Sequence, residues 1–345
     1  MANSVSAKQR VELARALLPA WLHDAYQSVL TLSDSDRFPH ALLLSSPLGW
    51  CERRLAAVVV CELLGLAPRL QAEEIAHPDL KWLEREDGSL FYKVAQIREA
   101  VGFIQRTAQG NGKKVIVVPH AHRMNVESAN ALLKVLEEPP AGSHWLLLSS
   151  EPGQLLPTIR SRCQTLVIAP GADLDTGDFI TELVAQTDPE LAAAIKPVEL
   201  AMLRFEFLGA PEQVATALLG GEEPIWPLLA GVVQDRDLIS SVAERWTERE
   251  LPELLAAWQR YVHAIVAARL PPFVSGDAYS AASLVAQKDA GERVVSTEKL
   301  EKLFKFVDEL REARQLATYH AGINRRLLLE RLLLRFSTLL AIRSQ

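Results

Sequence analysis

The stretch that most constrains this chain is 120–163, in which the pattern of a helix is followed by that of a buried strand. Apolar side chains recur three or four residues apart over 126–136, which predicts an amphipathic helix. Asn125 is a suitable N-cap for it, and Pro139-Pro140 cannot continue it, so both helix ends are marked. The apolar run 145–148 then predicts a short parallel strand that is buried on both faces.

Other segments continue this alternation of helix and strand. A second helical turn is expected at 155–159, and the run 164–168 has the composition of another strand. Residues 40–44 and 114–118 are predicted to be further core strands, and 93–105 is an amphipathic helix by its apolar period. Helices that alternate with buried strands indicate an α/β architecture with a parallel sheet.

Two strings within this stretch resemble a known family. Residues 130–140 read NALLKVLEEPP, and 158–163 read TIRSRC. Together they resemble the AAA+ clamp-loader subunits of bacterial DNA polymerase III, which comprise the ATPase gamma/tau and its relative without ATPase activity, delta-prime. Residues 19–22 and 322–336 also resemble delta-prime. The resemblance implies a protein that helps to load the sliding clamp onto DNA during replication.

The resemblance also implies a fold of the α/β plus all-α class. We expect an AAA+ parallel-sheet domain with a degenerate nucleotide site over 1–170, a small helical lid domain over 171–223, and a helical collar for oligomerisation over 224–345. Asp, Gly and Thr are frequent over 173–177, which predicts a linker. Within the collar, Pro271-Pro272, Gly276 and Ala290-Gly291 are expected to break the helices.

Composition limits the class of protein further. The 345 residues carry a net charge of −6, so the whole chain is not a strong nucleic-acid binder, although a local basic patch stays open. Its three cysteines form no C-x-x-C pair, which favours a reducing cytoplasm. No apolar run approaches the ~20 residues of a membrane span, so we expect a soluble cytoplasmic protein without membrane contact.

The loop after the first core strand decides whether this chain can be an ATPase. A phosphate-binding loop needs glycines, a lysine for the phosphates and a Ser or Thr for Mg²⁺. Aligned with GxxGxGK[ST], residues 46–53 keep one glycine of three, Gly49, and place Ser46 at the first glycine. Glu52 stands at the lysine position and Arg53 at the metal-hydroxyl position. We therefore interpret the loop as an ordinary strand-to-helix turn that binds no ATP.

Three further positions give the same answer. The acidic pair that would hold Mg²⁺ after strand 114–118 is replaced by Pro119 and His120. Ser149-Ser150 occupies the place of a γ-phosphate sensor, and 209–212 lacks the arginine of a second sensor. A functioning gamma/tau-type ATPase is the alternative, and it would require the missing lysine. An AAA+ scaffold or DNA-binding adaptor outside the replisome is a second alternative.

Metal and cofactor binding are also not expected. The family usually carries a four-cysteine zinc module between positions that correspond to Cys61 and Tyr92, and this chain has no cysteine there after Cys61. His120, His122 and His144 have no thiolates nearby in sequence, so they are interpreted as surface and cap histidines.

Arg162 is the candidate functional residue. The resemblance implies that Ser161-Arg162-Cys163 presents Arg162, as an arginine finger in trans, to ATP held by a neighbouring subunit, with Ser161 and Cys163 at the same interface. Arginine suits this task because it is always charged and offers a planar fork to phosphate oxygens. Arg160 is the second choice for the finger.

The implied partners are the gamma/tau ATPase subunits and the delta subunit in a hetero-oligomer, with the sliding clamp and primer-template DNA contacted indirectly. In the collar, an apolar stripe is predicted at Leu300, Phe304, Val307, Leu310 and Ala313. The leucine-rich last helix should be buried against other helices or a partner chain. Its charged edge, Arg325, Arg326, Glu330, Arg331 and Arg335, is interpreted as a solvated helix face.

Overall fold

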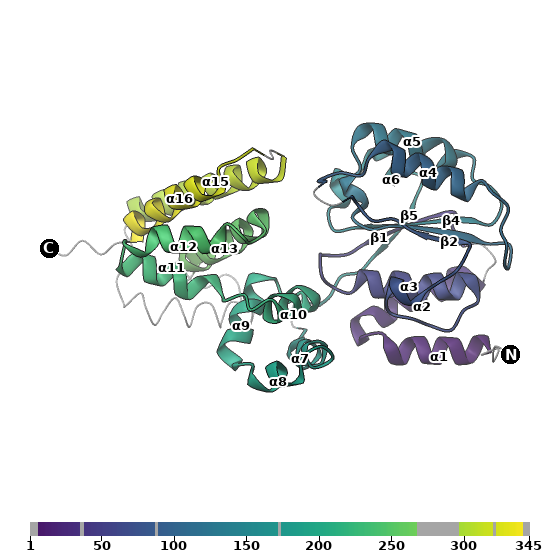
Figure 1. Cartoon of the computed structure of the whole chain (residues 1–345), viewed down its shortest axis with the longest axis horizontal. Helices are drawn as coiled ribbons and strands as arrows, with labels where there is room; N and C mark the ends of the chain where they lie inside the picture. Colours follow the sequence, from purple (N-terminus) through teal and green to yellow (C-terminus); the bar gives the residue numbers. More distant parts are fainter. Residues whose placement is uncertain are drawn as a thin grey trace. The chain divides into compact units, whose positions relative to one another are not determined.

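A computed structural model describes residues 6–34, 38–86, 89–171, 174–267, 297–319 and 322–340. The chain divides into two compact units, residues 1–171 and 172–345, which are considered separately below (Figure 1). The predicted helix breaks at Pro271-Pro272, Gly276 and Ala290-Gly291 lie outside the described residues.

The first unit contains a five-stranded sheet in the order β2-β3-β4-β1-β5, and every neighbouring pair is parallel. The strands are β1 (Ala41–Ser45), β2 (Leu80–Trp82), β3 (Lys114–Val118), β4 (Ser143–Ser149) and β5 (Gln164–Val167). Strands β1, β3, β4 and β5 confirm the predictions from their apolar runs. The sequence pattern did not reveal β2, which is only three residues long and half-buried at the sheet edge.

Helices cover both faces of this sheet (Figure 1). On one face lie α1 (Ala7–Leu17), α2 (His23–Asp34) and α3 (Glu52–Leu64), and on the other lie α4 (Val94–Ile104), α5 (Val126–Glu137) and the single turn α6 (Pro157–Arg160). Short 3₁₀ turns complete the unit: η1 (Ala20–Leu22), η2 (Ala72–Glu74), η3 (Ala121–Arg123) and η4 (Pro152–Gln154). Leu43, Ile116 and Trp145 point to the α4–α5 side, where they form one core. The fold class predicted from the alternating pattern is confirmed.

Helix α5 has the ends that the sequence predicts. The Asn125 side chain accepts a hydrogen bond from the Ser128 backbone N–H at 2.8 Å, which satisfies one of the free donors of the first turn. The helix ends at Glu137, and Glu138 is the C-cap residue immediately before the two prolines. The carboxylate of Glu137 therefore stands at the C-terminus of a helix.

The second unit contains helices and no strand among its described residues. Its helices are α7 (Gly177–Ala185), α8 (Pro189–Ala194), α9 (Pro197–Glu206), α10 (Pro211–Leu219), α11 (Ile225–Gln234), α12 (Leu238–Trp246), α13 (Leu251–Ala267), α15 (Thr297–Tyr319) and α16 (Arg325–Leu340). A small core lies among α7–α10, and a larger one lies among α11, α12, α13, α15 and α16. In the larger core the ring of Trp258 contacts those of Trp246, Phe306 and Phe336 edge-on, at centroid distances of 5.6, 5.7 and 5.5 Å. The boundary between lid and collar at residue 223 stays a prediction.

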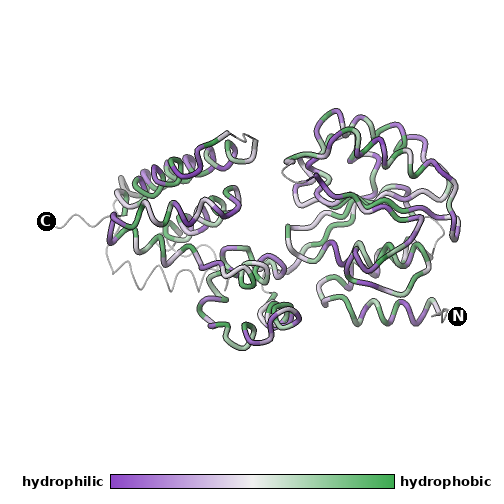
Figure 2. Tube along the Cα trace, viewed as in Figure 1, coloured by the Kyte–Doolittle hydropathy of each residue, from purple (hydrophilic) through white to green (hydrophobic). Residues whose placement is uncertain are grey.

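The apolar stripe predicted on α15 is partly wrong. Phe304 is 49% exposed, whereas Leu303 and Phe306 are buried in the core with Leu310. Two apolar stripes with helical spacing can be drawn on α15, and they share the residues of its C-terminal half. Packing against α13 and α16 decides which of the two stripes is buried. Figure 2 shows the alternation of hydrophilic and hydrophobic residues along these helices.

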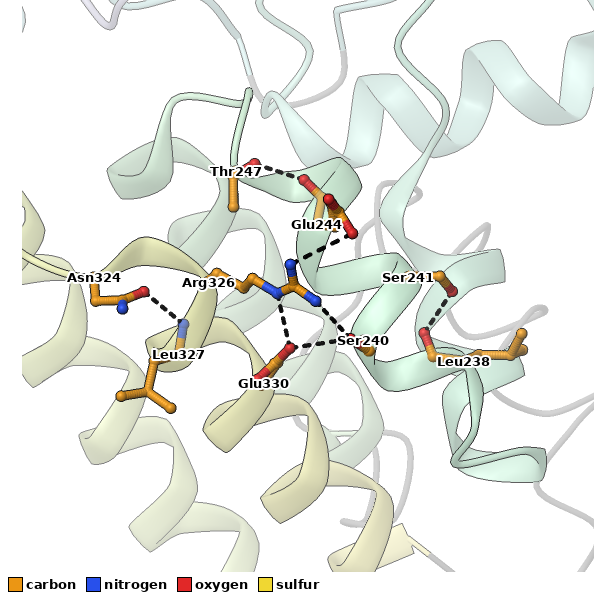
Figure 3. Close-up of polar contacts among 9 residues, drawn as sticks. All are labelled: Leu238, Ser240, Ser241, Glu244, Thr247, Asn324, Arg326, Leu327 and Glu330. Atoms are coloured by element: carbon orange, nitrogen blue, oxygen red, sulfur yellow. Dashed lines mark hydrogen bonds and ion pairs between the residues drawn. The ribbon is translucent and has the colours of Figure 1, made fainter.

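The charged edge of α16 also contacts its own unit. The Arg326 guanidinium donates to Glu330 Oε1 at 3.1 Å and to Ser240 Oγ at 2.9 Å, and it lies 3.6 Å from Glu244 (Figure 3). These contacts join α16 to α12. Arg326 stays half-exposed, so the interpretation of this edge as a solvated helix face agrees with the structure, and the contacts to α12 add to it.

No helix among the described residues is long and apolar enough to cross a membrane.

Candidate functional site

The candidate nucleotide site lies where β1, β3 and β4 end. Ligands of parallel α/β sheets bind beyond the carboxyl ends of the strands. The loop after β1 passes through Gly49 at φ 79° and Cys51 at φ 66°, and α3 begins at Glu52. Cys51 is thus a non-glycine residue in the left-handed region, and it is fully buried. The chain turns directly from strand to helix through these residues.

Tryptophans hold the middle of this loop. The ring of Trp50 is buried and meets that of Trp21 edge-on, at a centroid distance of 5.9 Å. The Trp21 indole N–H also donates to the Trp50 carbonyl at 3.4 Å. Trp21 lies in η1, so the loop is fixed to the segment that precedes α2. A phosphate-binding loop instead turns its backbone N–H groups toward an anion.

The first residue of α3, Glu52, is acidic. Glu52 is only 8% exposed in the first turn, where the positive end of the helix dipole favours a carboxylate. It thus brings a negative charge to the end of α3 at which a phosphate would bind.

Arg53 turns toward β2, where it pairs with Glu84 at 2.6 Å and lies 5.5 Å from the centre of the Trp82 ring. Burial lowers the pKa of Arg53, but the hydrogen bond and charge of Glu84 outweigh burial, so the pKa is raised. Arg53 is therefore a charged residue that is already paired within the chain.

The residues after β3 are held by uncharged contacts. The Pro119 carbonyl accepts a hydrogen bond from the Tyr92 hydroxyl at 2.6 Å, and His120 caps η3 with φ 47°. His122 Nδ1 lies 3.2 Å from Ser149 Oγ. Burial and then the charge of Arg123 lower the pKa of His122 to about 4, so its imidazole is neutral at pH 7. A neutral imidazole and a hydroxyl cannot replace a carboxylate pair that holds Mg²⁺.

Two of the histidines differ from their interpretation as surface residues. His122 and His144 are buried, and His144 Nδ1 lies 3.1 Å from the Pro39 carbonyl. Only His120, at the N-cap of η3, fits the description of a cap residue. The sequence gives no sign of this burial, because the hydrogen-bond partners of these rings, Ser149 and Pro39, lie far away in the sequence.

The parts of the chain that the structure describes contain no group of three or more His, Cys, Asp or Glu side chains close enough to hold a metal ion. Asp79, in the region where the family carries zinc, accepts hydrogen bonds from the backbone N–H groups of Gln109 and Gly110 at 2.9 and 2.7 Å. That this protein binds no zinc and no nucleotide stays a prediction.

Arg162 lies at the other end of the sheet. It follows α6 and precedes β5, and β5 begins beside Leu42 near the amino end of β1. The loop at Gly49 follows the carboxyl end of β1. Because all five strands are parallel, Arg162 and the degenerate loop lie at opposite ends of the strands of one sheet. Arg162 therefore cannot reach the nucleotide site of its own chain.

Two contacts fix the Arg162 side chain. Nη1 donates to the Thr158 carbonyl at 2.8 Å, and Nη2 donates to Glu137 Oε1 at 2.6 Å. A third of the side chain remains exposed. Beneath it, Ile159 is buried and Cys163 packs against the α4–α5 core, where burial raises the thiol pKa to about 11. Ser161 Oγ also donates to the Thr158 carbonyl, at 3.1 Å.

Arg160 differs from Arg162 although it lies in the same turn. It is exposed, and its guanidinium has no hydrogen bond or ion pair with any residue that the structure describes. The structure thus holds Arg162 in place, whereas Arg160 has no polar side-chain contact with the described part of the chain. Glu137, which makes this difference, was not singled out by the sequence pattern.

The sheet order, the helices on both faces and the following helical unit define the class. A five-stranded parallel sheet in the order β2-β3-β4-β1-β5 with an appended helical region is an AAA+ fold.

Comparison with known proteins identifies the family. A family model described as "DNA polymerase III, delta subunit" matches residues 22–172. The chain is 31% identical to DNA polymerase III subunit delta' of Pseudomonas aeruginosa over 319 residues, which cover 87% of this chain and 92% of that protein. It is 30% identical to the Escherichia coli subunit delta' over 189 residues, which cover 51% and 56% of the two chains. This chain belongs to the delta-prime subunit family of the DNA polymerase III clamp loader.

Proposed function

We propose that this protein is a clamp-loader subunit that hydrolyses no ATP itself and supplies Arg162 to ATP bound by a neighbouring subunit. One observation carries the proposal. The exposed, oriented guanidinium of Arg162 lies at the ends of the strands opposite to those that precede the chain's own degenerate loop. An arginine in that position can complete only a site that belongs to another chain.

The first half of the proposal, the absence of ATP hydrolysis, rests on three features of the loop and of the start of α3. Glu52 brings its negative charge to the N-terminus of α3, Arg53 is paired with Glu84, and Trp50 is packed against Trp21. Each of these would have to be undone before the loop could close on a phosphate. The alternative of a gamma/tau-type ATPase also lacks the lysine that contacts the phosphates.

The second half rests on the chemistry of arginine. In phosphoryl transfer, negative charge develops on the γ-phosphate and the leaving oxygen, and an arginine supplied in trans stabilises it. The guanidinium stays charged at any physiological pH and can donate two parallel hydrogen bonds to phosphate oxygens. Thr158 and Glu137 use one N–H on each terminal nitrogen of Arg162, so further donors remain for a phosphate.

Assembly with the gamma/tau ATPase subunits and the delta subunit is the corresponding proposal for the second unit. The region 224–345 would act as the collar, and Leu327 and Leu334, both exposed on one face of α16, would contact a partner. Through that complex the chain would act in the cytoplasm on the sliding clamp and primer-template DNA. A scaffold role without the arginine function is the remaining alternative.

The deciding experiment compares wild type, Arg162→Ala and Arg160→Ala in a reconstituted clamp-loader complex. We expect Arg162→Ala to leave assembly unchanged and to lower clamp loading, with ATP turnover stimulated by clamp and primed DNA also reduced. A hydrogen bond to a charged group contributes about 1.5–3 kcal/mol, which corresponds to roughly tenfold to a hundredfold at the one site affected. Arg162→Lys should restore little, because an ammonium lacks the planar fork.

Each result has a definite meaning. If only Arg160→Ala impairs loading, the finger is Arg160. If neither variant does, the arginine function is wrong and the scaffold alternative is favoured.

A further inference from the structure

The contact between Arg162 and Glu137 joins two sequence motifs that lie far apart in the chain. Glu137 is the last residue of α5, in the string LEEPP, and Arg162 follows α6 in the string SRC. Their side chains meet at 2.6 Å, while the Thr158 carbonyl holds the other terminal nitrogen of the guanidinium at 2.8 Å. Two acceptors on different elements therefore define both the position and the plane of the guanidinium.

The position of Glu137 is locally unfavourable for a carboxylate. The C-terminus of a helix carries the negative end of its dipole, and cationic residues are preferred there. The neighbouring Glu138 is exposed, and its carboxylate contacts none of the residues that the structure describes. Of these two adjacent carboxylates, only Glu137 has a partner, and that partner is Arg162.

We infer that Glu137 is a positioning residue for Arg162. It would hold the guanidinium in the orientation from which it contacts phosphate, so that fewer side-chain rotations are lost when the neighbouring subunit's ATP reaches its transition state. This inference rests on the proposed role of Arg162 as a finger.

The solvent exposure of the Glu137–Arg162 pair fits a role in orienting the guanidinium better than a role in stabilising the fold. Half of the Glu137 side chain and a third of the Arg162 side chain are exposed to solvent. Exposed ion pairs contribute little to stability. The bonds to Glu137 and Thr158 can both persist when the guanidinium contacts a phosphate, because each uses one N–H and further donors remain.

The test uses the reconstituted complex with Glu137→Ala, Glu137→Gln and the matched control Glu138→Ala. Clamp-loading rate, and kcat and KM for stimulated ATP turnover, are measured for each variant and again in an Arg162→Ala background. We expect Glu137→Ala to lower the clamp-loading rate and kcat by roughly threefold to tenfold with KM unchanged, since orientation acts on the transition state. Glu137→Gln, which retains an acceptor oxygen, should lose less, and Glu138→Ala should match wild type.

The double variant separates positioning from a merely structural role. If Glu137 acts through Arg162, Glu137→Ala should have no further effect once Arg162 is alanine. An equal loss in both backgrounds, or wild-type rates for Glu137→Ala while Arg162→Ala is impaired, would overturn the inference but leave the finger intact. A lower KM with unchanged or higher kcat would also overturn it, because Glu137 would then compete with ATP for the arginine. Wild-type rates for Arg162→Ala would instead overturn the proposed function itself.

Discussion

The hydroxyl of Tyr261 on α13 donates a hydrogen bond to Glu206 Oε1 at 2.9 Å, and both side chains are buried. The same oxygen accepts the backbone N–H of Ile225, the first residue of α11, at 2.6 Å. Glu206 ends α9, so a single carboxyl group joins the small helical core to the larger one. Burial raises the pKa of Glu206 to about 7, although its hydrogen bonds and two nearby arginines oppose this shift.

The raised pKa of Glu206 predicts a pH-dependent stability. The folded chain holds this proton up to about pH 7, whereas the unfolded chain releases it near pH 4.5, so the free energy of unfolding falls as pH rises between these values. Glu206→Gln keeps an acceptor oxygen and removes the charge. Chemical denaturation should therefore show that this variant gains stability relative to wild type at pH 8 compared with pH 5. The exposed Glu190→Gln should show no such difference, and an equal shift at both pH values would contradict the assignment.

His122 should give the opposite pH dependence of the free energy of unfolding. Its pKa is lowered from 6.5 to about 4, so the folded chain keeps it neutral while the unfolded chain takes up a proton. Its contribution to stability is complete above about pH 6.5 and is lost as pH falls toward 4. His122→Asn, which cannot be protonated, should weaken this pH dependence over that interval. An unchanged slope in denaturation experiments would show that His122 does not titrate in this way.

The degenerate loop predicts that the isolated protein does not bind Mg-ATP. Titration calorimetry at micromolar to millimolar nucleotide should give no saturable heat, since Glu52 repels phosphate and no lysine or metal-holding hydroxyl is present. Trp21 and Trp50 also provide an optical readout, because nucleotide in this loop would disturb their edge-on contact. Saturable binding or a change in tryptophan emission with micromolar Mg-ATP would contradict the prediction that this loop binds no nucleotide.

Gly142 should be intolerant of substitution. Its φ is 70°, and a Cβ on it would lie 2.1 Å from the Gly112 carbonyl oxygen. A non-glycine residue in the left-handed region costs about 1–2 kcal/mol, and the clash with backbone adds to that. Gly142→Ala should therefore lower the free energy of unfolding by more than about 2 kcal/mol. Gly153→Ala is the control, since nothing lies within 4 Å of its Cβ position, and equal stabilities for the two variants would contradict the prediction.

The exposed leucines of α16 test the collar. Leu327 and Leu334 lie seven residues apart on one helix face and are exposed in this chain. Burying one large apolar side chain contributes about 1.5–3 kcal/mol, so a double change to serine should weaken association with the ATPase subunits by at least roughly tenfold. Sedimentation at low protein concentration measures this. Val198→Ser on α9, an equally exposed apolar residue, is the control, and undiminished association of the double variant would place the contact elsewhere.

Local patterns predicted the regular parts of this fold well. Period and capping residues located α5 and its two ends, and apolar runs located four strands of the sheet. Strand β2 was missed because three half-buried residues that include Lys81 give neither an apolar run nor a readable alternation. The prediction that Phe304 lies on the buried stripe of α15 was wrong, because helical spacing alone cannot distinguish its stripe from the one that contains Phe306.

The site was harder to predict because its contacts join distant segments. Glu137 and Arg162 are 25 residues apart, and nothing in either string states that they meet. The one available signal was a carboxylate at a helix C-terminus, which needs compensation by a cation. Likewise, the ring of His122 in η3 lies against Ser149, which belongs to strand β4 and is 27 residues away in the sequence.

Arg162 and the degenerate loop lie at opposite ends of the strands of the sheet, so the two sides that this subunit offers to its neighbours differ. In a head-to-tail assembly, each interface joins one surface of a subunit to a different surface of the next subunit. Under the proposed function, this chain offers an arginine at one end of its sheet and no working nucleotide site at the other, so it takes part in a nucleotide-dependent junction on one side only. An arc of clamp-loader subunits would then have to begin or end at this chain, and the loss of its own nucleotide site would fix its position in the order of subunits.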